Sequence, residues 1–376
     1  MAIVTSDLTR AVPNREVLPP VLDELARAGV ERDGIRLVVG GGAHRPVTPH
    51  EMRDLVGRKL MASLDLVAHD AKRSDCVSVG RTPLGNDVRI NRIVADADLV
   101  IALGVVEVHE FAGFSGGRKA ILPGVAAYES ILQNHSVALL ECDTARPGIL
   151  AGNPIHEEML SAARLARLEF ILNVVLDGDN RVVALAAGDP EAAHGRLVEF
   201  VRATQTLSTT PEADILVTGP GSPLDLNFYQ SVKSLIALEP LVQRETTVVL
   251  LSACHDGMGS TELAAPFAAS ADPDGAMRAA AADYTVEKDH SYLLARFLAR
   301  CPQVIAWCPG ADPDGLRAIG LEVASGPEDA MARAIAHRRQ RSTRPRVLLF
   351  PRPQRTLPSS PPATDQPPIP VKGCCR

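Results

Sequence analysis

The sequence predicts an α/β protein of two domains with mostly parallel sheets and the active site in the cleft between them. Strand-like and helix-like segments alternate along the chain, which is typical of parallel sheets covered by helices. The length of 376 residues exceeds what one hydrophobic core usually holds, so two domains are expected. Aromatic residues make up only 3% of the chain, and the abundant small apolar residues suit close packing of helices on a sheet.

The N-terminal domain is expected to span residues 1–205. Its periodicity predicts strands at 2–5, 35–39 and 99–104 and a helix at 17–28, and a helix-rich stretch at 191–206 would join the two domains. Two of these strands run into glycine-rich loops. Because ligands bind beyond the carboxyl ends of parallel strands, Gly41 and Gly113 are expected at a binding site.

The C-terminal domain is expected to span residues 206–337. Its pattern predicts strands at 213–218 and 247–251 and a helix at about 228–238. Residues 338–376 are basic and rich in proline, which predicts a disordered tail.

Several classes of protein are disfavoured by composition. The net charge of -6, with no basic stripe ahead of the tail, argues against binding to nucleic acid. No apolar run reaches about 18 residues, so no membrane span is expected. The N-terminus lacks the features of a signal peptide, which makes a cytoplasmic location the expectation. The seven cysteines include no Cys-x-x-Cys pair, so neither a disulfide framework nor a zinc site is expected.

The loop between His109 and Lys119 is the most informative segment, and His135 follows shortly after it. Imidazoles act as bases or metal ligands near neutral pH. Glycines let backbone amides approach a phosphate or a flat cofactor, and a lysine can hold an anion or form a covalent bond. The loop is not a P-loop, because no Ser or Thr follows Lys119. We therefore interpret it as an active-site core, with an ordinary helix-end histidine as the alternative for His135.

Two upstream segments carry further candidates. His44 follows a run of three glycines, and Thr48 with Glu51 forms a capping box that would start a helix behind that loop. Asp7 and Arg10 follow the first strand. The guanidinium could bind a substrate carboxylate while the aspartate orients it, or the two could form a local ion pair.

The predicted helix at 228–238 carries a third set of candidates. Gln230 and Lys233 lie one turn apart on one face, with Tyr229 beside them. A hydroxyl, an amide and an ammonium group could grip a small hydroxy acid. A solvated helix face is the alternative.

Taken together, these segments resemble the nickel-pincer lactate racemase family from residue 1 to about 335. The resemblance is carried by Asp7-x-Thr9-Arg10, Gly42-x-His44-Arg45-Pro46-x-Thr48, His109-x-x-Ala-Gly-Phe-Ser-Gly-Gly-x-Lys119, Asn134-His135, Gly152-Asn153-Pro154-x-His156-Glu157, Pro223-Leu224-Asp225-x-Asn227-x-Tyr229-Gln230-x-x-Lys233 and Asp256-Gly257-x-Gly259. The family carries a further stretch ahead of the first motif. The expected N-terminal domain is therefore incomplete or begins upstream of Met1.

The resemblance implies a racemase of a small 2-hydroxy acid, lactate by default, that transfers hydride to and from a nickel-pincer nucleotide. This cofactor, pyridinium-3-thioamide-5-thiocarboxylic acid mononucleotide, would be attached covalently to Lys119. The other implied roles are nickel ligation by His135, acid/base catalysis by His44 and His109, cofactor contacts from Asp7, Gly116 and Gly117, and substrate binding by Arg10, Tyr229, Gln230 and Lys233. The implied partners are cofactor-synthesis and nickel-insertion proteins.

Elementary chemistry agrees with these roles. The α-hydrogen of a hydroxy acid is too weakly acidic for an unaided base, whereas a hydride acceptor avoids the carbanion. The hydroxyl group points to different sides in the two enantiomers, so one histidine is needed on each side. Imidazole also suits nickel. Two alternatives stay open: a racemase or epimerase of another, bulkier or dicarboxylic 2-hydroxy acid, and a non-catalytic cofactor-binding paralogue.

Overall fold

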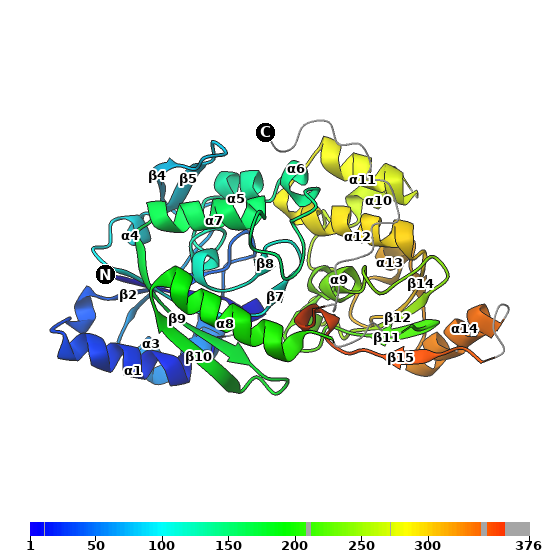
Figure 1. The fold of residues 1–376 in the computed structure, drawn as a ribbon, viewed down its shortest axis with the longest axis horizontal. Coiled ribbons are helices and arrows are strands. Elements are labelled where there is room, and N and C mark those ends of the chain that lie inside the picture. The colour runs from blue at the N-terminus through cyan, green and yellow to red at the C-terminus, as the bar shows by residue number, and fades with distance from the viewer. Residues whose placement is uncertain (11, 208–211, 271, 340–343, 358–376) are drawn as a thin grey trace. The chain divides into compact units, whose positions relative to one another are not determined.

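The computed structural model describes residues 1–376 except 11, 208–211, 271, 340–343 and 358–376. The chain forms two compact units (Figure 1). Unit 1 consists of Met1–His135 and Asp143–Thr204, and unit 2 of Ser136–Cys142 and Gln205–Arg376. The predicted α/β fold with two domains and mostly parallel sheets is confirmed. The predicted limits placed all of residues 1–205 in the first domain. The segment Ser136–Cys142, which follows His135, instead belongs to unit 2.

Unit 1 is built on a six-stranded sheet of order β10-β9-β6-β1-β2-β3. Its strands are β1 (Ala2–Ser6), β2 (Arg36–Gly40), β3 (Asp65–Ala68), β6 (Val100–Val105), β9 (Leu168–Leu176) and β10 (Val182–Gly188). All neighbours in this sheet pair in parallel except β10, which pairs antiparallel with β9 at the edge. Two short antiparallel pairs accompany it: β4 (Cys76–Arg81) with β5 (Asp87–Asn91), and β7 (Val108–His109) with β8 (Gly113–Phe114).

The helices of unit 1 connect these strands. They are η1 (Leu8–Arg10), α1 (Asn14–Arg27), η2 (Arg32–Gly34), α2 (Pro49–Val56), α3 (Arg58–Met61), α4 (Arg92–Ala95), η3 (Gly117–Ala120), α5 (Tyr128–Asn134), α7 (Pro154–Leu165) and α8 (Pro190–Gln205). In Figure 1, α8 runs in front of the hairpin of β9 and β10. The capping box predicted for α2 is confirmed, with the Thr48 side chain bonded to the Glu51 amide and the Glu51 side chain to the Thr48 amide.

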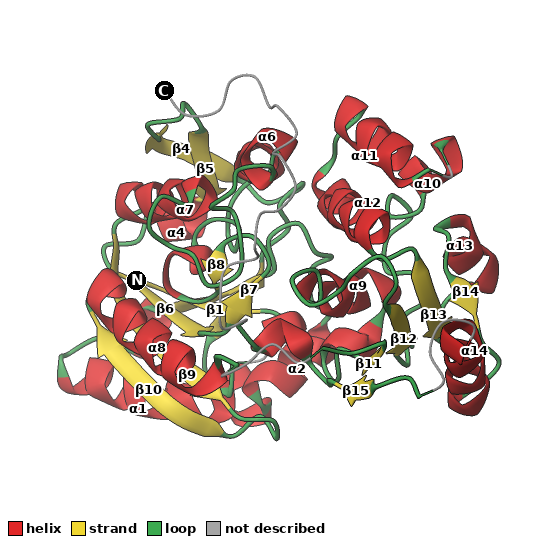
Figure 2. Ribbon diagram, turned by 45° about the vertical axis from the view of Figure 1, so that its right-hand side comes forward, coloured by secondary structure: helices red, strands yellow, loops and turns green. Residues whose placement is uncertain are grey.

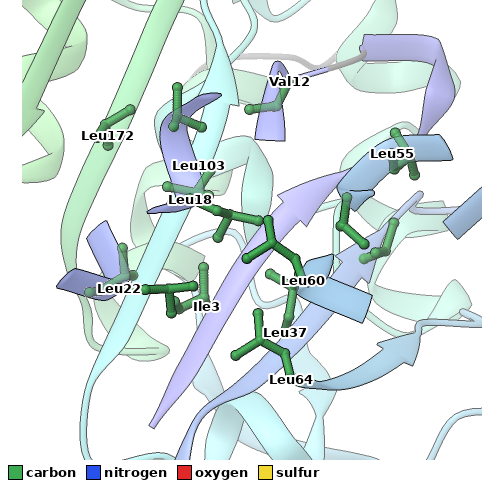
Figure 3. Packing of buried hydrophobic residues seen from close by; sticks show 14 of the residues in the cluster. Ile3, Val12, Leu18, Leu22, Leu37, Leu55, Leu60, Leu64, Leu103 and Leu172 are labelled. Atoms are coloured by element: carbon green, nitrogen blue, oxygen red, sulfur yellow. The ribbon is translucent and has the colours of Figure 1, made fainter. Parts of the chain in front are cut away.

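One face of this sheet packs against α1, α2 and α3. Alternate residues of the strands point toward these helices, as the period of two in a strand requires. Leu37 on β2 and Leu103 on β6 meet Leu18 on α1 in this core, and all three are fully buried (Figure 3). This close packing holds the strands in place, so the loops at their carboxyl ends begin from fixed positions.

Unit 2 contains a five-stranded, fully parallel sheet of order β14-β13-β12-β11-β15. Its elements are α6 (Val137–Leu140), β11 (Ile215–Thr218), η4 (Leu224–Leu226), α9 (Phe228–Ala237), β12 (Thr247–Leu251), α10 (Ala265–Ala269), α11 (Pro273–Ala282), η5 (Val286–Lys288), α12 (Asp289–Arg300), β13 (Gln303–Trp307), α13 (Pro313–Ala318), β14 (Glu322–Val323), α14 (Pro327–Arg339), β15 (Val347–Leu349) and η6 (Pro353–Arg355). Figure 2 shows α13 and α14 beside β14.

The prediction of a disordered tail over residues 338–376 is wrong for its first part. Arg338 lies in α14, and the apolar run Val347–Leu349 forms β15, which extends the sheet beside β11. Leu357 then pairs with Thr206. The sequence pattern does not reveal this strand, because only a short apolar run stands between basic and proline-rich stretches. Residues 358–376 lie outside the described part of the chain.

No helix among the described residues is long and apolar enough to cross a membrane.

Candidate active site

Three adjacent parallel strands deliver the candidate residues of unit 1. β1 ends at Ser6, directly before Asp7. β2 ends at Gly40, at the start of the loop that holds His44. β6 ends at Val105 and leads to His109. The strands are neighbours in the order β6-β1-β2, so their loops meet at one edge of the sheet, where ligands of parallel α/β sheets bind.

Asp7 is buried and pairs with the half-buried His44. His44 Nδ1 lies 2.8 Å from Oδ2 of Asp7, while Thr9 donates to the other carboxylate oxygen from its amide and its hydroxyl. Burial alone would raise the pKa of Asp7, but the charge of His44 and these hydrogen bonds outweigh it, so the pKa is lowered. Asp7 is therefore a carboxylate at neutral pH that orients the His44 ring.

Arg10 forms an ion pair with a residue outside the site predicted from the sequence. Its Nε lies 3.3 Å from a carboxylate oxygen of Glu107, and both side chains are mostly buried. The expected side-chain pair between Asp7 and Arg10 is not the arrangement found, because Asp7 faces His44 instead. Glu107 follows β6, so an acidic group from a neighbouring strand orients the guanidinium.

Phe111 stands at the centre of the remaining candidates. Its ring is 2% exposed and makes edge contacts with His109, at 4.7 Å between centroids, and with His135, at 5.0 Å. The ammonium nitrogen of Lys119 lies 5.9 Å from the same ring centre, within the range of a cation–π contact. Two imidazoles and one amine from three separate elements are thus arranged around one aromatic ring.

Hydrogen bonds fix the orientation of both imidazoles. His135 Nδ1 lies 3.1 Å from the Ile131 carbonyl, which can only accept, so the proton sits on Nδ1 and the lone pair on Nε2. His109 Nδ1 lies 3.3 Å from the Ala112 amide and 3.3 Å from a Glu110 carboxylate oxygen. A backbone donor and a carboxylate therefore both face this nitrogen, while the ring rests on Phe111.

Two asparagines hold the 109–119 loop from outside. Asn153, the N-cap of α7, donates to the carbonyl of Phe111 at 2.8 Å. Asn173 on β9 accepts from the Gly117 amide at 2.7 Å. The loop backbone passes so close that a Cβ at Gly116 would lie 2.8 Å from the Asn173 oxygen, and both glycines have positive φ angles. Glycine is needed here for close approach and conformation.

The residues present could supply two of the groups that a nickel cofactor needs. His135 presents an imidazole in the tautomer that metal ligands use, and Lys119 supplies an amine nearby. In the described part of the chain, no group of three or more His, Cys, Asp or Glu side chains could hold a metal ion. A metal at His135 would therefore need most of its ligands from a cofactor, which is what a pincer-type nucleotide offers.

The candidates of unit 2 lie on α9, at the carboxyl end of β11. Gln230 and Lys233 are 3% and 5% exposed, so the alternative of a solvated helix face is wrong. Asn227 caps this helix by accepting from the Gln230 amide. The structure thus buries an amide and an ammonium group on one turn.

Tyr229 belongs to a cluster with α12. Its hydroxyl donates to Asp289 at 3.0 Å, and its ring contacts the ring of His290 in a tilted arrangement, with 4.3 Å between centroids. Burial, followed by the charge of Asp289, raises the pKa of Tyr229 well above its usual range. Tyr229 therefore remains a phenol that donates to Asp289. Neither Asp289 nor His290 was singled out from the sequence, because no motif connects them to α9.

Comparisons with known proteins show the family of the chain. Residues 1–148 match the lactate racemase N-terminal domain, and residues 208–348 match the lactate racemase C-terminal domain. Lactate racemase from Lactiplantibacillus plantarum is 36% identical over 348 residues, covering 90% of this chain and 81% of the relative. The chain belongs to the lactate racemase family.

Two further comparisons involve Thermoanaerobacterium thermosaccharolyticum. Its lactate racemase is 40% identical over 279 residues, or 74% of this chain, and the chain spans only 65% of that relative's length. The structure of the lactate racemase apoprotein from this organism covers 96% of the chain, with a TM-score of 0.87 and 33% identity, and 86% of the solved protein is matched. The fold of this lactate racemase family member is thus that of a solved relative.

Proposed function

We propose that this protein racemises a small 2-hydroxy acid, with lactate as the substrate, and that it uses a nickel-pincer nucleotide attached to Lys119. The observation that carries the proposal is the arrangement around Phe111, where His109, His135 and Lys119 meet one ring. The lactate racemases to which the chain is similar support lactate as the substrate.

Lys119 and His135 are the residues that would hold the cofactor. Lys119 would supply the amine of the covalent bond, and His135 would bind nickel through Nε2, since its Nδ1 proton faces the Ile131 carbonyl. Gly116 and Gly117 precede Lys119, and their lack of side chains lets Asn173 and His194 pack against the loop backbone there. When bound, such a cofactor accepts the α-hydrogen of the acid with its electron pair and returns it.

His44 and His109 move the hydroxyl proton. His44 keeps its Nδ1 proton toward the Asp7 carboxylate, so Nε2 is its basic nitrogen. The buried carboxylate stabilises the imidazolium that forms when His44 accepts the proton from the substrate oxygen. His109 differs, because its Nδ1 accepts from the Ala112 amide and also lies 3.3 Å from the Glu110 carboxylate, which would stabilise the imidazolium. Each histidine serves the enantiomer whose hydroxyl group faces it.

Arg10, Tyr229, Gln230 and Lys233 would bind the acid. Arg10 supplies a planar guanidinium suited to a carboxylate, oriented by Glu107. Lys233 would supply a buried ammonium group and Gln230 a neutral amide on the same helix turn. These cationic and amide groups are suited to the carboxylate and hydroxyl of a 2-hydroxy acid.

The test is to express the chain together with cofactor-synthesis and nickel-insertion proteins, then to measure its intact mass and its racemisation of D- and L-lactate. We expect a covalent adduct that is absent from Lys119→Ala, and racemisation in both directions. His44→Gln and His109→Gln should each lower kcat by about 10²–10⁴-fold. The matched control is His50→Gln, an exposed imidazole on α2, which should retain full activity.

Two results would overturn parts of the proposal. A wild-type protein without adduct or nickel under these conditions would remove the cofactor assignment. A loaded protein that leaves lactate unchanged but racemises another single-enantiomer 2-hydroxy acid from a panel would replace the substrate.

A further inference from the structure

Arg118 is a buried cation inside the 109–119 loop. Its side chain is 3% exposed. One terminal nitrogen donates to the carbonyls of Ala112 and Phe114, both at 2.9 Å, and the other donates to the carbonyl of Gly116 at 3.3 Å. The guanidinium therefore binds alternate carbonyls of its own loop, and these carbonyls lie between His109 and Lys119 in the chain.

A histidine from α8 closes this network. His194 Nε2 lies 3.0 Å from the second terminal nitrogen of Arg118 and 2.8 Å from the Ser115 carbonyl. In its neutral form this nitrogen either accepts from the guanidinium or donates to the carbonyl, so the ring secures the loop in either tautomer. The ring also lies close to Gly117, where a Cβ would be 3.2 Å from it.

The charge of Arg118 makes the loop and the side chain depend on each other. Burial lowers the pKa of Arg118 to about 9, and no carboxylate in the described part of the chain opposes that shift. A buried cation is costly unless its hydrogen bonds are made. The loop carbonyls accept from both terminal nitrogens here, while Nε makes no hydrogen bond within the described part of the chain, so the cation depends on this conformation of the loop.

We propose that Arg118 is a positioning residue: its guanidinium, secured by His194, holds the loop backbone in the shape that places His109 and Lys119 around Phe111. The effect of Arg118 on catalysis rests on the proposed function. A lysine could not replace Arg118, because an ammonium is a point charge, whereas the planar fork reaches three carbonyls at fixed angles.

The first test uses the cofactor-free protein and hydrogen–deuterium exchange of its backbone amides. In Arg118→Lys, we expect exchange of the 109–119 amides to rise by about tenfold or more, with the sheet strands β1 and β2 unchanged. Arg164→Lys is the matched control, because Arg164 forms an exposed ion pair with Glu191 between α7 and α8, and it should leave the loop unchanged. Loop exchange equal to wild type in a folded Arg118→Lys would overturn the proposal.

A second variant covers the case in which Arg118→Lys does not fold. His194→Gln leaves Arg118 in place and removes only the outer contact, so loop exchange should rise by a smaller factor. Unchanged exchange in that variant, or a uniform rise over all of unit 1, would contradict the proposal.

The loaded enzyme gives a separate readout. In Arg118→Lys or His194→Gln, we expect lower adduct occupancy at Lys119 and a lower kcat per loaded molecule, with KM for the acid little changed, because Arg10 and α9 are untouched. A rise in KM alone would contradict the positioning role. A wild-type protein without adduct would overturn the proposed function instead, while the exchange data would still decide the role of Arg118.

Discussion

The imidazole of His44 and the carboxylate of Asp7 are 37 residues apart in the chain, yet their side chains meet at 2.8 Å. They meet because β1 and β2 are parallel neighbours in register, with Ser6 opposite Gly40, so the residues that follow the two strands share one edge of the sheet. The pair resembles the carboxylate–imidazole unit that orients a general base in many enzymes.

Asp7→Asn should therefore lower kcat by about 10²–10⁴-fold, because the amide no longer stabilises the imidazolium and can favour the wrong tautomer of His44. KM should change little. Racemisation rates of the loaded enzyme, normalised to adduct occupancy, check this. The control is Thr9→Val, which removes one donor to Asp7 but leaves the carboxylate against His44. A wild-type kcat in Asp7→Asn would show that His44 does not depend on this partner.

Phe111 should be required for alignment beyond its contribution to stability. Phe111→Ala removes a buried ring and should cost about 3–5 kcal/mol of unfolding free energy. Phe111→Leu keeps most of the apolar volume and should cost less than about 2 kcal/mol, yet it leaves His109, His135 and Lys119 without their shared surface. We expect its kcat to fall by more than tenfold.

The matched control for this variant is Phe297→Leu, since Phe297 is fully buried in α12 of unit 2. Urea unfolding should give similar losses of stability for the two leucine variants, whereas kcat should fall only in Phe111→Leu. Equal activity in both variants would reduce Phe111 to a core residue.

Local pattern was enough to predict a minority of the elements, chiefly the central strands of both sheets and the helices α1, α8 and α9. The predicted strand at 247–251 is β12, and the predicted helix at 228–238 is α9. The capping box at Thr48 was also predicted, because its determinants lie within four residues. β15 was missed because its three apolar residues are too few to outweigh the surrounding composition, and its stability comes from pairing with β11.

Long-range contacts explain what the sequence could not reveal about the site. Asn173 reaches the Gly117 amide across 56 residues, and His194 reaches the Ser115 carbonyl across 79 residues. Neither has a local signal, since an asparagine in a strand and a histidine in a helix are unremarkable in sequence. Glu107 and Phe111 could have been chosen as candidates, because they stand two residues from His109. Only the fold shows that Glu107 faces Arg10 and that Phe111 faces His135.

Gly113 should tolerate no side chain. Its φ is +77°, and a Cβ there would lie 2.2 Å from the Ile149 carbonyl oxygen. Gly113→Ala should therefore cost at least about 3 kcal/mol. Gly29 is the control, because its φ of +84° is similar but no atom lies within 4 Å of a Cβ, so Gly29→Ala should cost only about 1–2 kcal/mol. Equal losses in urea unfolding would mean that backbone conformation, and not space, determines both.

His194 should make the protein less stable in acid. Burial, and then the charge of Arg118, lowers the pKa of His194 from its usual value of 6.5 to about 3. Between these values the unfolded chain binds a proton that the folded protein does not. The stabilising contribution is therefore complete above pH 6.5 and is lost as the pH falls toward 3.

Inside that window the free energy of unfolding should fall by about 1.4 kcal/mol per pH unit for this one group. His156, whose pKa burial also lowers to about 3, should add to the slope. Urea unfolding of the cofactor-free protein between pH 4 and about pH 8 should show a shallower slope in His194→Gln than in wild type. His50→Gln, which removes an exposed imidazole, should leave the slope unchanged. If His194→Gln keeps the full wild-type slope, His194 is protonated in the folded protein, and its contact with Arg118 must then be repulsive.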